Sequence, residues 1–126
     1  MSKGLKATFL IHFIVAILSA IGMLFFPAMF MGWMGWTSGV AAPLVRLQGT
    51  MILAFAISSW LGYRATEAQQ VKLIVTTEVW LTVVGTLVSL YGVLFEGAPA
   101  MMWGNVIIFA IFAVLWIVFY PKTKQG

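Results

Sequence analysis

Residues 7–26, ATFLIHFIVAILSAIGMLFF, form an apolar run in which His12 is the only side chain able to carry a charge. A helix of about 20 such residues is long enough to cross a hydrocarbon core of about 30 Å. A run of this kind is buried either in protein or in lipid, and the remainder of the sequence indicates which.

The whole chain is too apolar for a soluble fold of its length. Apolar residues make up 63% of the 126 residues, and charged residues make up 8%, whereas an ordinary soluble domain has roughly 25% charged residues. A small soluble domain leaves much of its surface in water and cannot hide this much apolar area. We therefore predict a multi-pass protein of the cell (inner or plasma) membrane whose immediate partner is the lipid bilayer.

Three further apolar runs follow the first. Prolines stand at several of their borders, where a fixed φ and a missing N–H favour helix starts and stops. The predicted spans are 7–26, 44–62, 73–94 and 101–120. The predicted fold class is all-α: a membrane four-helix bundle forming one domain over residues 1–126. The uncharged connection 27–43 holds Trp33 and Trp36, and we expect it to lie in the membrane interface as a loop or short helix.

The basic residues predict an orientation. In a four-span arrangement, only Arg46 falls on one side of the membrane. Six fall on the other side: Lys3, Lys6, Arg64, Lys72, Lys122 and Lys124. Because Lys and Arg are enriched in cytoplasmic segments, both termini are predicted to be cytoplasmic. The same distribution explains the net charge of +4 without a nucleic-acid partner.

Ionisable side chains inside a span are costly and are the first candidates for function. Glu78 begins a polar stripe on the third span, followed by Thr82 and Thr86 at helical spacing. His12 lies at a similar depth in the first span, so a contact with Glu78 is possible. Such a pair could exchange protons. Alternatively, it could be a polar contact that fixes helix register, or Glu78 could extend towards the interface.

A second stripe of mostly small residues is expected on the second span. Its members are spaced by four residues: Arg46, Thr50, Ala54, Ser58 and Gly62. Small residues at this spacing allow close helix packing. Arg46 would then point into the bundle, where Glu96 and Asn105 are its expected partners. The cluster could be a structural ion pair or a site for an anion or lipid headgroup.

No catalytic residues, metal site or cofactor are predicted. The chain has no Cys and a single His, and it contains no phosphate-binding loop, zinc spacing or nucleophile–base motif. We therefore expect a protein that is not an enzyme. His12 could ligate the metal of a haem or chlorophyll, although a second His for a bis-His haem is lacking.

Residues 43–65, PLVRLQGTMILAFAISSWLGYRA, carry a resemblance. The Arg46–Leu47–Gln48–Gly49 step, followed by a helix ending in a basic loop, resembles the second helix of small bacterial and archaeal four-helix membrane proteins described as DoxX-like. The resemblance covers about a fifth of the chain by motif and implies an architecture, without a catalytic residue to carry over.

Three functions are compatible with this pattern. The first is a non-enzymatic accessory or structural subunit that packs in a homo-oligomer or with other membrane subunits. The second is a small channel or carrier formed by oligomerisation, with a polar path through Glu78 and His12. The third is a lipid- or pigment-binding membrane protein, because the chain's many aromatic side chains could frame a lipid, quinone or carotenoid.

Overall fold

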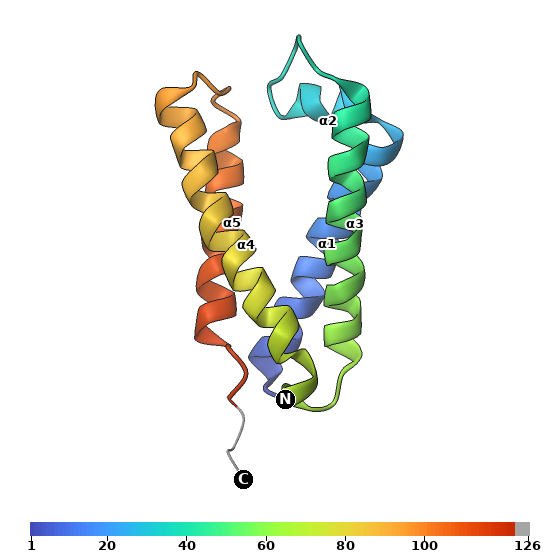
Figure 1. The fold of residues 1–126 in the computed structure, drawn as a ribbon, viewed down its shortest axis with the longest axis vertical. Coiled ribbons are helices and arrows are strands. Elements are labelled where there is room, and N and C mark those ends of the chain that lie inside the picture. Colours follow the sequence, from blue (N-terminus) through green and yellow to red (C-terminus); the bar gives the residue numbers. More distant parts are fainter. Residues whose placement is uncertain (123–126) are drawn as a thin grey trace.

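The computed structural model describes residues 1–122, and every regular element among them is a helix (Figure 1). The helices are α1 (Lys3–Phe25), α2 (Pro27–Trp33), α3 (Ala42–Arg64), α4 (Ala68–Phe95) and α5 (Met102–Val118). The predicted all-α class is confirmed. Lys124, one of the basic residues used to predict orientation, lies outside the described residues.

Three of the helices, α1, α3 and α4, are long and apolar enough to cross a membrane. The fourth long helix, α5, is also apolar but has 17 residues. At 1.5 Å per residue it is about 26 Å long, slightly shorter than a typical hydrocarbon core. Length and composition therefore support three candidate spans, with α5 close to the required length.

Local capping explains where α4 begins. The helix starts at Ala68, five residues before the predicted span 73–94. Glu67 caps this helix start. Its side chain accepts a hydrogen bond from the backbone N–H of Gln70, and the Gln70 side chain accepts one from the Glu67 N–H at 3.1 Å. This reciprocal arrangement satisfies N–H groups that the first helical turn leaves open.

Pro27 and Pro43 stand at helix starts. α1 ends at Phe25, and Pro27 then occupies the first turn of α2. Pro43 occupies the first turn of α3 in the same way. A proline fits there because the first-turn N–H groups have no partner within the helix. The connection predicted over 27–43 thus contains a short helix at one end of the molecule (Figure 1).

The long helices form two hairpins. α1 packs along α3 and α4 packs along α5, while contacts between the two pairs are few. The pairs lie together where α1 and α4 begin and diverge towards the end that holds α2 (Figure 1). Two glycines let α1 and α3 approach closely, because a Cβ at Gly49 would lie 2.8 Å from Met23 and one at Gly62 would lie 2.4 Å from Phe9.

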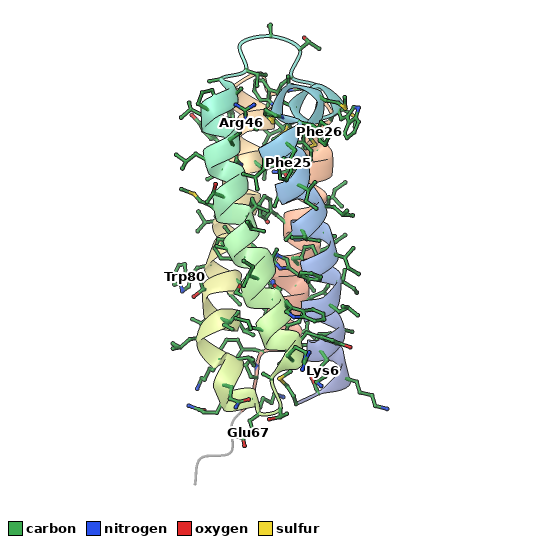
Figure 2. The ribbon with its side chains drawn as sticks, turned by 90° about the vertical axis from the view of Figure 1, so that its right-hand side faces the viewer. Lys6, Phe25, Phe26, Arg46, Glu67 and Trp80 are labelled. Carbon is green, nitrogen blue, oxygen red and sulfur yellow. The ribbon has the colours of Figure 1, made fainter. Side chains whose placement is uncertain are left out.

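The tightly packed core lies where the hairpins meet. Its buried members come from α1, α4 and α5: Leu5, Phe9, Val71, Val75, Phe112 and Trp116. The outer surface of the helices is also apolar, as Leu73 at 83% exposed and Trp80 at 68% illustrate. Figure 2 shows Trp80 projecting away from the helices. Such a surface is unfavourable in water and suits contact with lipid.

Candidate functional site

A chain of three polar side chains links three helices at the centre of the molecule. Nδ1 of His12 on α1 lies 2.6 Å from Oγ of Ser59 on α3. Nε2 of His12 lies 3.5 Å from Oε2 of Glu78 on α4. The structure therefore brings His12 and Glu78 together, as their similar depth allowed.

The three side chains are enclosed by protein. Ser59 and Glu78 are 0% exposed and His12 is 8% exposed. The rings of Phe112 and Trp116 pack edge-on against the imidazole, with centroids 4.8 Å and 5.5 Å away. Low-polarity surroundings of this kind strengthen electrostatic interactions and make an unpaired polar group expensive.

Glu78 is not fully satisfied by these contacts. Neither carboxylate oxygen has a hydrogen-bond partner among the described residues, and Oε2 lies 3.5 Å from Nε2 of His12. A buried acceptor without a donor costs about 1–3 kcal/mol, and more when it is charged. Glu78 is thus a buried acidic group with open acceptor positions, a feature that structural packing alone does not explain.

The geometry suits proton exchange better than nucleophilic catalysis. Both ring nitrogens of His12 face a polar atom, so a closer approach of Glu78 to Nε2 would allow proton exchange between them while Ser59 donates to or accepts from Nδ1. The Ser59 hydroxyl and the His12 imidazole also have the arrangement of a nucleophile and its base, which the sequence did not predict. Its 0% exposure keeps it away from any substrate in this conformation.

The threonines of the α4 stripe use their hydroxyl hydrogens locally. Thr82 donates to the Glu78 carbonyl at 2.7 Å, and Thr86 donates to the Thr82 carbonyl at 2.6 Å. Thr82 is buried beside Glu78, whereas Thr86 is partly exposed. These two hydroxyls have only acceptor capacity left for a ligand.

A cavity of about 190 Å3 lies between the two hairpins and reaches His12. Most of its wall is apolar, and its polar lining residues are His12, Ser19, Gln48, Thr82 and Asn105. A second crevice of about 500 Å3, nearer the diverging ends, also borders Gln48 and Asn105. The two hollows therefore share part of their wall, in the region where the hairpins separate (Figure 1).

The small-residue stripe predicted on α3 is wrong for the packing of this chain. Arg46, Thr50 and Ala54 are exposed, and Ser58 is only partly buried. The face that is buried consists of Val45, Gly49, Ala56, Ser59 and Gly62. Residues spaced strictly by four rotate about 40° per step around a helix with 3.6 residues per turn. Over four steps the stripe therefore turns by about 160° and reaches the buried face only at its last member, Gly62.

Arg46 does not join the predicted outer polar cluster. Within residues 1–122, no ion pair links Arg46 with Glu96, and both side chains are exposed. Asn105 instead donates through Nδ2 to Oγ of Ser89 at 2.9 Å, which ties α5 to α4. The expectation that Arg46 points into the bundle is therefore wrong.

Metal binding has limited support in the part of the chain that the structure describes. It contains no group of three or more His, Cys, Asp or Glu side chains placed to hold a metal ion. A haem or chlorophyll metal at His12 would have to replace Ser59 at Nδ1 or Glu78 at Nε2. In the described geometry, Nδ1 is hydrogen-bonded to Ser59, whereas Nε2 faces Glu78 inside the protein.

No family model, curated protein or solved structure matches this chain. The resemblance of residues 43–65 to DoxX-like proteins stays a prediction.

Proposed function

We propose that this chain is a four-span membrane protein that binds a small, largely apolar molecule between its two hairpins. The supporting observation is the cavity of about 190 Å3 that has His12 in its lining. Apolar walls with a few polar groups are typical of sites for lipid-soluble ligands. A lipid, quinone or pigment with one or two hydrogen-bonding groups would suit this lining.

The proposed topology has α5 as the fourth span and both termini in the cytoplasm. α5 pairs with α4 along its length, so lipid around α4 would also surround α5. Its 17 residues are within the range of about 17–25 known for membrane helices. α1 and α4 begin, and α3 and α5 end, where the hairpins meet (Figure 1). Near these helix ends lie Lys3, Lys6, Arg64, Lys72 and Lys122, and this is the end that we place inside.

Ligand retention tests this proposal directly. The protein would be purified in mild detergent from the membrane in which it is made, and bound molecules would be identified by native mass spectrometry. Ser19→Phe should displace the ligand, because Ser19 lines the cavity. Leu18→Phe is the matched control, since Leu18 is 64% exposed on the outer surface. A wild-type protein free of small molecules, or equal retention by both variants, would contradict the proposal.

An accessory or structural subunit is the second candidate. It is favoured by Thr50 and Ala54, which are small, exposed and spaced for close helix packing, yet unused by this chain. A second copy or another membrane subunit could cover this face. Thr50→Leu should then reduce co-purification of the partner or dissociate the oligomer in light-scattering measurements, whereas Leu47→Met should have no such effect.

A carrier is a further alternative, because the hollow between the hairpins is wide at one end and packed at the other. Carriers expose a central site to one side of the membrane at a time. Proteoliposome flux would test this role, and unchanged proton or solute flux after Glu78→Gln would exclude the assigned path.

A further inference from the structure

A separate pocket of about 280 Å3 opens between α3 and α4. Its seven lining residues come only from these two helices, and only Phe55 also borders the cavity between the hairpins. Both helices are candidate membrane spans, so the pocket would open towards lipid. It is therefore distinct from the site of the proposed function, and the inference below goes beyond that function.

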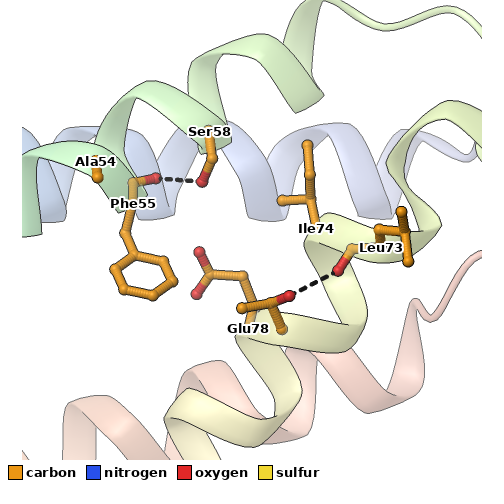
Figure 3. A pocket seen from close by; sticks show the side chains of 7 residues that line it. Ala54, Phe55, Ser58, Leu73, Ile74 and Glu78 are labelled. Carbon is orange, nitrogen blue, oxygen red and sulfur yellow. Dashed lines mark hydrogen bonds between the residues drawn. The ribbon is translucent and has the colours of Figure 1, made fainter. Parts of the chain in front are cut away.

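Glu78 supplies the polar end of this pocket. Figure 3 shows its carboxylate pointing across the gap from α4 towards α3, with Phe55 and Ser58 on the opposite side. The side chain is 0% exposed and both of its oxygens lack a hydrogen-bond partner in the described chain. A buried acid aimed into a pocket in this way can be satisfied by a donor that a ligand brings.

The other polar atoms of the pocket are acceptors as well. Ser58 donates its hydroxyl hydrogen to the Phe55 carbonyl at 2.9 Å, and Thr77 donates its own to the Leu73 carbonyl at 2.9 Å. Each hydroxyl oxygen can then only accept a further hydrogen bond. The lining contains no Lys, Arg, Asn or Gln. The pocket therefore favours a ligand head that donates hydrogen bonds and does not need to accept any.

We propose that the α3–α4 pocket binds an amphipathic primary amine. Its ammonium group would pair with Glu78 and supply up to three N–H donors, which match the carboxylate and the hydroxyl oxygens. The ring of Phe55 adds a surface that attracts cations. Leu73, Ile74 and Ala54 complete an apolar wall for the hydrocarbon tail.

Access to Glu78 requires a small rearrangement. Because the carboxylate has no exposed surface, the ammonium group would reach it by displacing a side chain that covers it. Phe55 and Ile74 are partly exposed and border the pocket, so either can turn outwards into the lipid. Changes of side-chain rotamer are common when ligands bind.

Binding of dodecylamine to the protein in phosphatidylcholine nanodiscs tests this site, with empty nanodiscs as background. Glu78→Gln should weaken binding at least tenfold, because the amide keeps the shape of the side chain but loses its charge. Glu96→Gln is the matched control and should leave affinity unchanged. Dodecanol, which lacks the charge, should bind no more weakly to Glu78→Gln than to the wild type. Dodecyltrimethylammonium, which lacks N–H donors, should bind several-fold more weakly than dodecylamine.

Two further variants keep the test decisive. Ser58→Leu fills the pocket without touching the charge, so it should also weaken dodecylamine binding and decides the matter if Glu78→Gln does not fold. Ser19→Phe should leave dodecylamine binding intact, which separates this site from the proposed function. Equal binding of dodecylamine to wild type, Glu78→Gln and Ser58→Leu would overturn the proposal, as would equal affinities for the amine and the alcohol.

A primary ammonium group could come from a single-chain amine or from the ethanolamine headgroup of a membrane lipid. Repeating the titration in nanodiscs that contain phosphatidylethanolamine separates these sources. Weaker apparent binding of dodecylamine in the wild type would indicate that the lipid headgroup occupies the site. Unchanged binding would identify the single-chain amine as the occupant.

Discussion

Nε2 of His12 and Oε2 of Glu78 lie 3.5 Å apart, although 66 positions separate them in the sequence. The contact joins α1 of one hairpin to α4 of the other, and Ser59 extends it to α3. The packed core joins the same two hairpins through side chains of α1, α4 and α5. The polar chain adds a further link between the hairpins beside this core.

His12→Ala should destabilise the protein by about 3 kcal/mol, because it leaves a buried acid without its nearest partner. Glu78→Gln should cost less, since the amide carries no charge and can donate to the imidazole. Thermal unfolding in detergent, followed by circular dichroism, measures both effects. The double variant His12→Ala/Glu78→Gln should be more stable than His12→Ala alone. If the second change adds a full independent penalty, the two side chains do not act as a pair.

Gly62 is the second position where a small change has a large expected effect. A Cβ there would lie 2.4 Å from the ring of Phe9, which is 0% exposed and packs against Trp116 at a centroid distance of 5.0 Å. The buried ring or the helices would have to shift to accept the methyl group, so Gly62→Ala should destabilise the protein by about 1–3 kcal/mol.

Gly104→Ala is the control, because nothing lies within 4 Å of the added Cβ. Its expected effect is a gain of up to about 1 kcal/mol from helix propensity. Equal melting temperatures for the wild type and Gly62→Ala would contradict the close approach of α1 and α3.

The sequence predicted the long helices well because each one is a long apolar run, and hydropathy identifies such runs without tertiary information. The ends were less accurate. α4 begins at Ala68 because Glu67 and Gln70 cap each other, and such local hydrogen bonds extend a helix beyond its apolar part. α1 likewise begins at Lys3, within the polar segment before the predicted span.

The candidate site was only partly predictable. His12 and Glu78 stand out because ionisable residues are rare in these spans. Ser59 does not, because the uniform spacing of four residues on α3 selected Ser58 instead. Alternating steps of three and four, which follow the true helical period, lead from Val45 and Gly49 to Ala56 and Ser59. The separation of the hairpins has no sequence signal of this kind, because it depends on contacts between distant residues.

Two pairs of outer polar residues can be compared: Ser89 and Asn105 share a hydrogen bond, whereas Arg46 and Glu96 form no ion pair in the described chain. Arg46→Ala and Glu96→Ala should have additive effects within about 0.3 kcal/mol, because no ion pair joins these exposed side chains within residues 1–122. Ser89→Ala and Asn105→Ala should instead show a coupling of about 0.5–1.5 kcal/mol, since a hydrogen bond of 2.9 Å links them. Double-mutant cycles on unfolding free energy measure both terms. A larger coupling for Arg46 and Glu96 would restore the salt bridge predicted from sequence.

The proposed topology can be tested with single cysteines, because the chain has none of its own. Ser38, Ala100, Thr66 and Lys122 are exposed positions in connections or after α5. With both termini cytoplasmic, a membrane-impermeant maleimide added to whole cells should label Ser38→Cys and Ala100→Cys. Thr66→Cys and Lys122→Cys should react only after the membrane is permeabilised.

The Lys122→Cys variant decides whether α5 is a span. If its 17 residues were too short to cross, residues 100 and 122 would lie on the same side of the membrane and label together from outside. A shorter helix can still cross, because the bilayer thins locally around it at a cost of a fraction of a kcal/mol per Å. α5 is only about 4 Å shorter than the hydrocarbon core, and its packing against α4 offsets that small cost. We therefore expect Ala100→Cys and Lys122→Cys to label from opposite sides.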